Sequence, residues 1–148
     1  MSVLRLALAA AVIGGVSIFG SSGASALTAV LKGANQVGTA GDPDGFGTAA
    51  VEIVSPTTIC FGLVVSKIDK PVEFHIHKGA KGTNGDVVVP FVPPKNGNPG
   101  TASGCQSGIS TVLLNQIRRN PSAFYVNVHT GKFPEGAIRG QLLKVTPP

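Results

Sequence analysis

The chain has 148 residues, of which 43% are hydrophobic and 13% are charged. This composition excludes a disordered or fibrous chain, which would be poor in apolar residues or strictly repetitive. The formal net charge is +5, but the basic residues are scattered and have no aromatic cluster beside them, so nucleic-acid binding is not favoured. The length fits one domain, and twenty Gly and eleven Pro indicate short strands joined by tight turns.

The first 26 residues have the pattern of a secretory signal peptide. Arg5 supplies a positive start, residues 6–19 form an uncharged apolar run, and Ala24-Ser25-Ala26 is a small-residue cleavage site. We therefore predict cleavage after Ala26 and an exported chain of residues 27–148, located outside the cell or in the cell envelope. After cleavage, no remaining stretch is long enough to predict a membrane span. The alternative is that this segment is retained as an N-terminal anchor.

Two cysteines, Cys60 and Cys105, belong to the predicted exported chain. An even number of cysteines in an oxidising compartment predicts one disulfide. Closing a loop of about 45 residues would contribute roughly 4 kcal/mol in the chain-entropy description. Two thiolates bound to a metal ion are the alternative.

The sequence of residues 27–148 predicts an all-β domain with one short helix. Leucines and an isoleucine recur at helical spacing in residues 110–120, where Ser110 is a candidate N-cap and Pro121 a stop signal. Residues 93–104 have no periodicity and are predicted as a loop. Turn residues separate the predicted strands, which favours a Greek-key β-sandwich or barrel of seven or eight antiparallel strands. The predicted strands span residues 27–31, 48–54, 57–65, 72–77, 87–92, 124–129 and 137–145.

All three histidines lie in two of these strands. His75 and His77 are two residues apart, so they share one strand face with Glu73, while Phe74 and Ile76 point the other way. In the second strand His129 shares a face with Tyr125 and Asn127. If the two strands are neighbours, one polar face gathers these side chains.

Three converging imidazoles suit copper or zinc, so His75, His77 and His129 are candidate metal ligands. Two alternatives stay open. The histidines could simply be the polar side of amphipathic strands, or they could bond to loop carbonyls and hold the Gly-rich loop that follows His77.

The sequence offers little support for an enzyme. No serine sits in G-x-S-x-G, and neither a phosphate-binding loop nor a dinucleotide fingerprint is found, so a hydrolase or nucleotide enzyme is not favoured. In the last strand Arg139 shares a face with Gln141, opposite Ile138 and Leu142. We expect Arg139 to pair with the carboxylate of Glu73 or Glu135 and so to hold the closing strand in place. We expect Tyr125 and Asn127 to form hydrogen bonds with loop carbonyls.

Three segments together resemble the chordin-type (CHRD) domain. Residues 74–88 resemble its first signature, residues 120–130 with 133–142 its second, and residues 31–37 its opening strand and turn. The resemblance covers about residues 27–146. It implies an extracellular or cell-envelope binding or structural module, with a protein or a cell-surface polysaccharide as partner. The activity of this domain is not established, and growth-factor antagonism is not implied, because chordin carries separate cysteine-rich modules.

A weaker likeness is to copper–zinc superoxide dismutase, at the level of the fold. In that likeness His75, His77 and His129 match copper ligands and Arg139 matches an anion-guiding arginine. The bridging fourth histidine and the zinc-binding cluster of that enzyme are missing here. The likeness therefore implies at most a three-histidine copper or zinc site, with redox activity as its extension.

Overall fold

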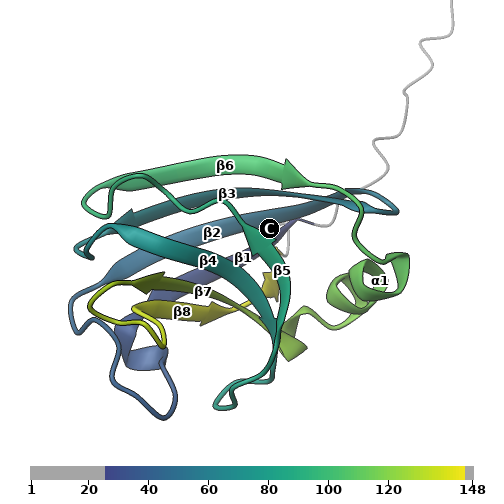
Figure 1. The fold of residues 1–148 in the computed structure, drawn as a ribbon. Coiled ribbons are helices and arrows are strands. Elements are labelled where there is room, and N and C mark those ends of the chain that lie inside the picture. The colour runs from purple at the N-terminus through teal and green to yellow at the C-terminus, as the bar shows by residue number, and fades with distance from the viewer. Residues whose placement is uncertain (1–25, 146–148) are drawn as a thin grey trace, which may run out of the picture.

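Nine strands form one antiparallel sheet that curls into a nearly closed barrel (Figure 1). The computed structural model describes residues 26–145, so the predicted signal peptide lies outside the described residues apart from Ala26. The strands are β1 (Leu27–Lys32), β2 (Phe46–Ser55), β3 (Thr58–Ser66), β4 (Pro71–Lys78), β5 (Val87–Phe91), β6 (Gly100–Gln106), β7 (Phe124–Thr130), β8 (Ile138–Gln141) and β9 (Leu143–Lys144).

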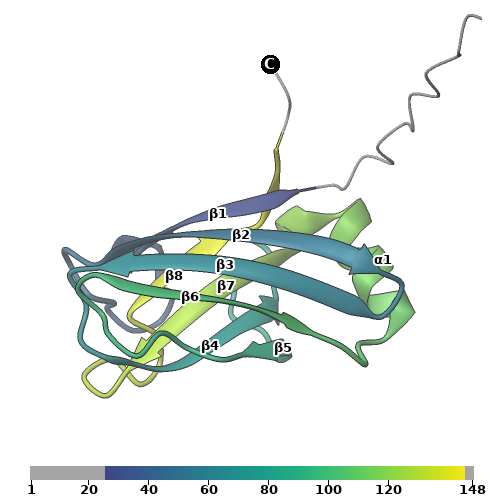
Figure 2. The same cartoon turned by 90° about the horizontal axis from the view of Figure 1, so that it is seen from above.

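The spatial order of the strands is β5-β4-β7-β8-β1-β2-β3-β6, and β9 pairs with β1. Two walls result, one of β1, β2, β3 and β6 and the other of β4, β5, β7 and β8 (Figure 2). The predicted all-β barrel or sandwich with one short helix is confirmed.

Alternating apolar residues fill the space between the walls. In β2, for example, Ala49, Val51 and Ile53 are buried while the residues between them are exposed. Phe61, Phe74 and Phe91 meet in the core with ring centroids 4.4 to 5.3 Å apart. Burial of these side chains is the main favourable term for the fold.

One α-helix covers an end of the barrel (Figure 1). Helix α1 (Thr111–Arg119) follows Ser110 and ends just before Pro121, close to the predicted bounds, although the Ser110 side chain makes no capping hydrogen bond. Leu114 and Ile117, one helical turn apart, are its buried residues. Short 3-10 turns lie at Gly33–Asn35 and Pro121–Ala123. Among the described residues, no helix is long and apolar enough to cross a membrane.

Two parts of the sheet differ from the sequence prediction. Most of β6 was predicted as loop, which is wrong, because this strand pairs with β3 along its whole length. Its sequence, Gly-Thr-Ala-Ser-Gly-Cys-Gln, lacks alternation because most of its residues are exposed at the sheet edge. The predicted last strand is interrupted at Leu142, whose N–H donates to the carbonyl of Phe124, so that it forms β8 and β9.

The predicted disulfide is confirmed. Cys60 and Cys105 lie directly opposite each other in β3 and β6, with Cα atoms 3.9 Å apart, and they are bonded. The alternative of two thiolates on a metal ion is therefore excluded.

Candidate metal centre

Three loops cover the outer face of the wall formed by β4, β7 and β8. Every residue of β7 is buried, because one face packs in the core and the other lies beneath these loops. The loops are residues 33–45 (the first loop), 79–86 (the Gly-rich loop) and 131–137 (the third loop). The first two are joined by a bond from Asn84 Nδ2 to the carbonyl of Val37, 3.0 Å long. The candidate site lies between these loops and the sheet.

Strand pairing places all three histidines on this covered face. β4 and β7 are antiparallel neighbours, with Glu73 opposite His129, His75 opposite Asn127 and His77 opposite Tyr125. Phe74 and Ile76 are fully buried in the core, as the alternation predicted. The predicted polar face therefore forms.

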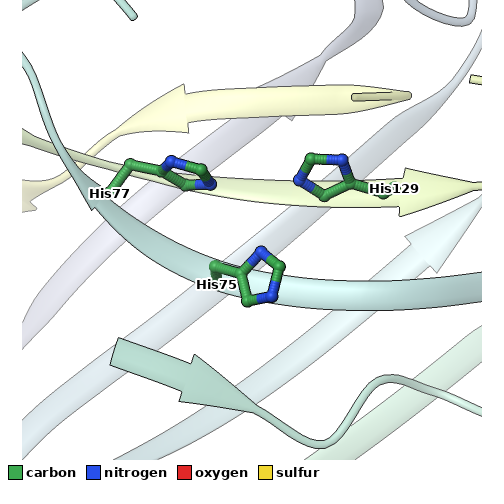
Figure 3. Close-up of side chains that lie close together, drawn as sticks. All are labelled: His75, His77 and His129. Carbon is green, nitrogen blue, oxygen red and sulfur yellow. The ribbon is translucent and has the colours of Figure 1, made fainter. Parts of the chain in front are cut away.

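The three imidazole rings point toward a common space between β4 and β7 (Figure 3). One ring nitrogen from each of His75, His77 and His129 lies within 4.8 Å of the other two. His77 and His129 are buried, each 8% exposed, whereas the His75 side chain is 15% exposed. The cluster is thus open to solvent mainly at His75.

Backbone carbonyls fix the orientation of two of the rings. His77 Nδ1 lies 2.9 Å from the carbonyl oxygen of Gly85, and His129 Nδ1 lies 2.8 Å from that of Pro134. Since a carbonyl only accepts, Nδ1 is the protonated nitrogen in both neutral rings, and Nε2 keeps its lone pair. This carbonyl contact is a common outer-sphere arrangement for histidine ligands of metals.

Two nitrogens of the cluster are buried without a hydrogen-bond partner among the described residues. They are His75 Nδ1 and His77 Nε2. The third available nitrogen, His129 Nε2, lies 3.2 Å from Asn127 Nδ2. Asn127 is oriented in turn by Gln36, whose Nε2 donates to Asn127 Oδ1 at 2.7 Å. The first loop is thereby connected to the histidines.

The surroundings favour neutral imidazoles. Burial lowers the pKa of His75, and the neighbouring His129 and His77 lower it further, against a smaller opposing effect of Glu73. Burial also lowers the pKa of His77, opposed in part by its bond to Gly85. Neutral imidazole is the form that binds metal ions.

Arg139 does not pair with a carboxylate, contrary to the sequence prediction. Its guanidinium donates to Asn84 Oδ1 and to the carbonyl of Thr83, both at 2.9 Å, and lies 3.6 Å from the centre of the Tyr125 ring. Arg139 thus holds the Gly-rich loop in place instead of pairing with an acidic residue. The expected carbonyl contacts of Tyr125 and Asn127 are also wrong. The Tyr125 hydroxyl accepts from the N–H of Gly85, and the Asn127 amide bonds to the side chains of Gln36 and His129.

The family model for the CHRD domain matches residues 27–142. The chain belongs to the CHRD domain family. This match spans the complete sheet up to β8 and includes all three histidines. A search of curated proteins found no match.

Family membership does not by itself assign a function to this CHRD domain. The structure brings together every candidate residue of the predicted polar face, with Glu73 at its margin, 3.8 Å from His75 Nε2. Sequence reasoning missed Gln36, Gly85 and Pro134, which contact the site from the three loops. Gly85 and Pro134 act through backbone carbonyls, the kind of contact that the second alternative predicted without naming a residue.

Proposed function

We propose that this CHRD domain binds one copper or zinc ion through His75, His77 and His129. The observation that carries the proposal is the convergence of one ring nitrogen from each histidine within 4.8 Å, at a place where His75 Nδ1 and His77 Nε2 are buried without a hydrogen-bond partner among the described residues. A buried polar atom without a hydrogen bond costs about 1–3 kcal/mol. A metal ion at this place would satisfy His75 Nδ1 and His77 Nε2 together.

The donor set limits the kind of ion. Imidazole nitrogens suit copper and zinc, whereas calcium and magnesium require oxygen ligands. Two nitrogens bound at about 2.0–2.1 Å can be at most about 4.2 Å apart. Three equally spaced nitrogens at that distance from one ion are about 3.6 Å apart. Ring nitrogens that are 4.8 Å apart would therefore have to approach each other by about 1 Å on binding.

The proposed ligand atoms are His75 Nδ1, His77 Nε2 and His129 Nε2. His129 Nε2 would exchange its contact with Asn127 Nδ2 for the ion. His75 Nε2 would then carry its proton toward Glu73, which lies 3.8 Å away and is largely exposed. A solvent molecule has access from the His75 side, as a further ligand. For the protein with copper bound, we further propose redox activity like that of superoxide dismutase.

The second candidate is a binding or structural module without metal, which would act on a protein or polysaccharide partner. The bond between His77 Nδ1 and the Gly85 carbonyl favours this second candidate, because a histidine that holds a loop in place has a structural role without metal. Both candidates are proposed to act outside the cell or in its envelope. The signal-like residues 1–26 and the Cys60–Cys105 disulfide support this location.

The deciding experiment is titration of the tag-free, disulfide-bonded chain from residue 27 with Cu(I), Cu(II) and Zn(II). Tyr125 is the single tyrosine and the chain has no tryptophan, so protein fluorescence reports this residue alone. It stacks on His77 with ring centroids 4.8 Å apart, so Cu(II) at the cluster should quench it. One equivalent at 100 times its dissociation constant should add about 2.7 kcal/mol of stability.

His75→Gln separates the two candidates. Within residues 26–145, His75 makes no hydrogen bond through Nδ1, and its side chain has no hydrogen bond to any of the three loops. A metal site predicts that this variant loses tight binding but keeps its melting temperature. The metal proposal fails if the natural chain binds no stoichiometric ion, or if His75→Gln binds it equally well.

A further inference from the structure

A cleft lined in part by Arg139 lies near the histidine cluster, because the Tyr125 ring contacts both Arg139 and His77. The cleft has a volume of about 630 Å³. Its floor is the outer face of β1, β8 and β9, and its walls are the first loop and the tip of the Gly-rich loop. The lining residues used below are Val30, Gln36, Lys81, Arg139, Gln141 and Leu143.

The main feature of this cleft is a buried cation without an anion. Arg139 is 2% exposed, yet no carboxylate lies within 4 Å of it among residues 26–145. Buried arginines are rare unless they are paired. Its bonds to Asn84 and Thr83 use two of its five N–H groups, and their acceptors are a neutral amide and a carbonyl. Apart from these two neutral acceptors, the guanidinium has the face of the Tyr125 ring, 3.6 Å away, as a partner, and no anion lies beside it among the described residues.

The rest of the lining adds one positive charge and no negative one. Lys81 is a second cation, exposed at the rim, and no aspartate or glutamate lines the cleft. Gln36 and Gln141 contribute amides, while Val30 and Leu143 expose about half of their surfaces. An apolar cleft with a few convergent polar groups is the usual form of a small-molecule site, and its volume lies in the usual range.

We propose that this cleft binds a small organic carboxylate, with its charged group at Arg139 and Lys81 and its aliphatic part against Val30 and Leu143. The carboxylate would supply the missing counter-charge, since arginine and carboxylate form strong, charge-assisted hydrogen bonds. The aliphatic part would cover the two exposed apolar side chains. The site is independent of any metal ion, because no histidine lines it.

The test is titration of the disulfide-bonded chain from residue 27, which contains the whole sheet, with hexanoate in the presence of EDTA. Tyr125 again serves as reporter, because the Arg139 guanidinium lies 3.6 Å from its ring. The Nε–H signal of Arg139 in NMR gives a second, direct reading. Hexanamide, the neutral analogue, should bind at least about tenfold more weakly, as expected for loss of a charged hydrogen bond. Inorganic phosphate should also bind more weakly, because it has no aliphatic part.

Two variants on the exposed rim keep the test independent of folding. Lys81→Ala should weaken hexanoate binding by about three- to tenfold, in the range of a partly screened charge contact. Val30→Asp should abolish it, because the new carboxylate would stand in the cleft. Lys95→Ala, an exposed lysine outside this cleft, is the matched control and should bind like the natural chain.

Several results would overturn the proposal. They are the absence of saturable hexanoate binding, equal affinity for hexanamide or phosphate, and equal affinity of Lys81→Ala and Lys95→Ala. Loss of hexanoate binding in His75→Gln would also overturn it, because the anion would then be located at the histidine cluster. Since EDTA is present throughout, failure of the metal proposal would leave the result unaffected.

Discussion

Gly85 shows how a single residue connects the Gly-rich loop to the candidate metal centre. Its carbonyl accepts from His77 and its N–H donates to the Tyr125 hydroxyl. A Cβ at this position would lie 1.7 Å from the carbonyl oxygen of Lys78. Only glycine lets the loop return so close to the end of β4, and this return is what orients the His77 ring.

Gly85→Ala should therefore disturb both the fold and the site. Steric overlap of this kind typically costs about 1–3 kcal/mol in stability, sometimes more. Urea unfolding should show that loss, and metal affinity should fall with it, because His77 loses its acceptor. Gly131→Ala is the matched control, since nothing lies within 4 Å of its added Cβ and its φ is not positive. Equal stability of the two variants would contradict this account of the loop.

The sequence predicts one half of the site and not the other. The alternation of side chains in a strand places His75 with His77, and His129 with Asn127, on the correct faces, because this period is a local property. The contacts of Gln36 and Pro134 depend on how distant loops return over the sheet. The expected Arg139–carboxylate pair is wrong for the same reason, since loop atoms occupy the place of an acid.

At the scale of elements, strands with a regular apolar pattern were predicted and β6 was not. β2 and β3 alternate clearly, because one of their faces is in the core. β6 (Gly100–Gln106) has only one buried residue, Gly100. Its sequence therefore has no alternation of apolar residues that would indicate a strand paired with β3. The Cys60–Cys105 bond therefore acts on the strand with the least packing of its own.

Removing this disulfide should loosen β6 before the rest of the sheet. In Cys60→Ser/Cys105→Ser, the free energy of unfolding should fall by up to about 4 kcal/mol, the chain-entropy value for a loop of this length. Hydrogen exchange should accelerate at Gly100–Gln106 more than in β2, which is paired on both sides. Reduction of the natural chain should give the same pattern. Uniform acceleration over the whole sheet would show that β6 does not open by itself.

At the scale of the whole molecule, this barrel has one strand, β7, that is buried on both faces. The core covers the inner face of β7, and the three loops cover its outer face, so ionisable groups lie where a simple barrel would expose them. The folded state consequently holds His75 and His77 at lowered pKa values. This burial makes the global stability of the metal-free protein depend on pH.

The sign of that dependence follows from where the protons bind. Above the pKa of about 6.5 of a histidine in an unfolded chain, both states hold neutral rings and stability does not change with pH. As pH falls below that value, the unfolded chain takes up protons that the folded His75 and His77 resist, so the free energy of unfolding decreases. The slope approaches about 1.4 kcal/mol per pH unit for each such histidine. It levels off only below the folded pKa values.

We expect the metal-free chain to be most stable above pH 7 and to lose stability from pH 7 toward pH 5.5. Urea unfolding in EDTA at several pH values measures this loss, and His75→Gln should show a shallower decline because one of the two groups is gone. Asp42, whose pKa is raised mainly by burial, has the opposite sign and stabilises the fold as pH falls toward the carboxyl range. Asp42→Asn removes that contribution and should steepen the decline at the more acidic pH values where carboxyl groups titrate. A free energy of unfolding that is constant between pH 7 and 5.5 would contradict this account. It would mean that His75 and His77 take up protons as readily in the folded protein as in the unfolded chain.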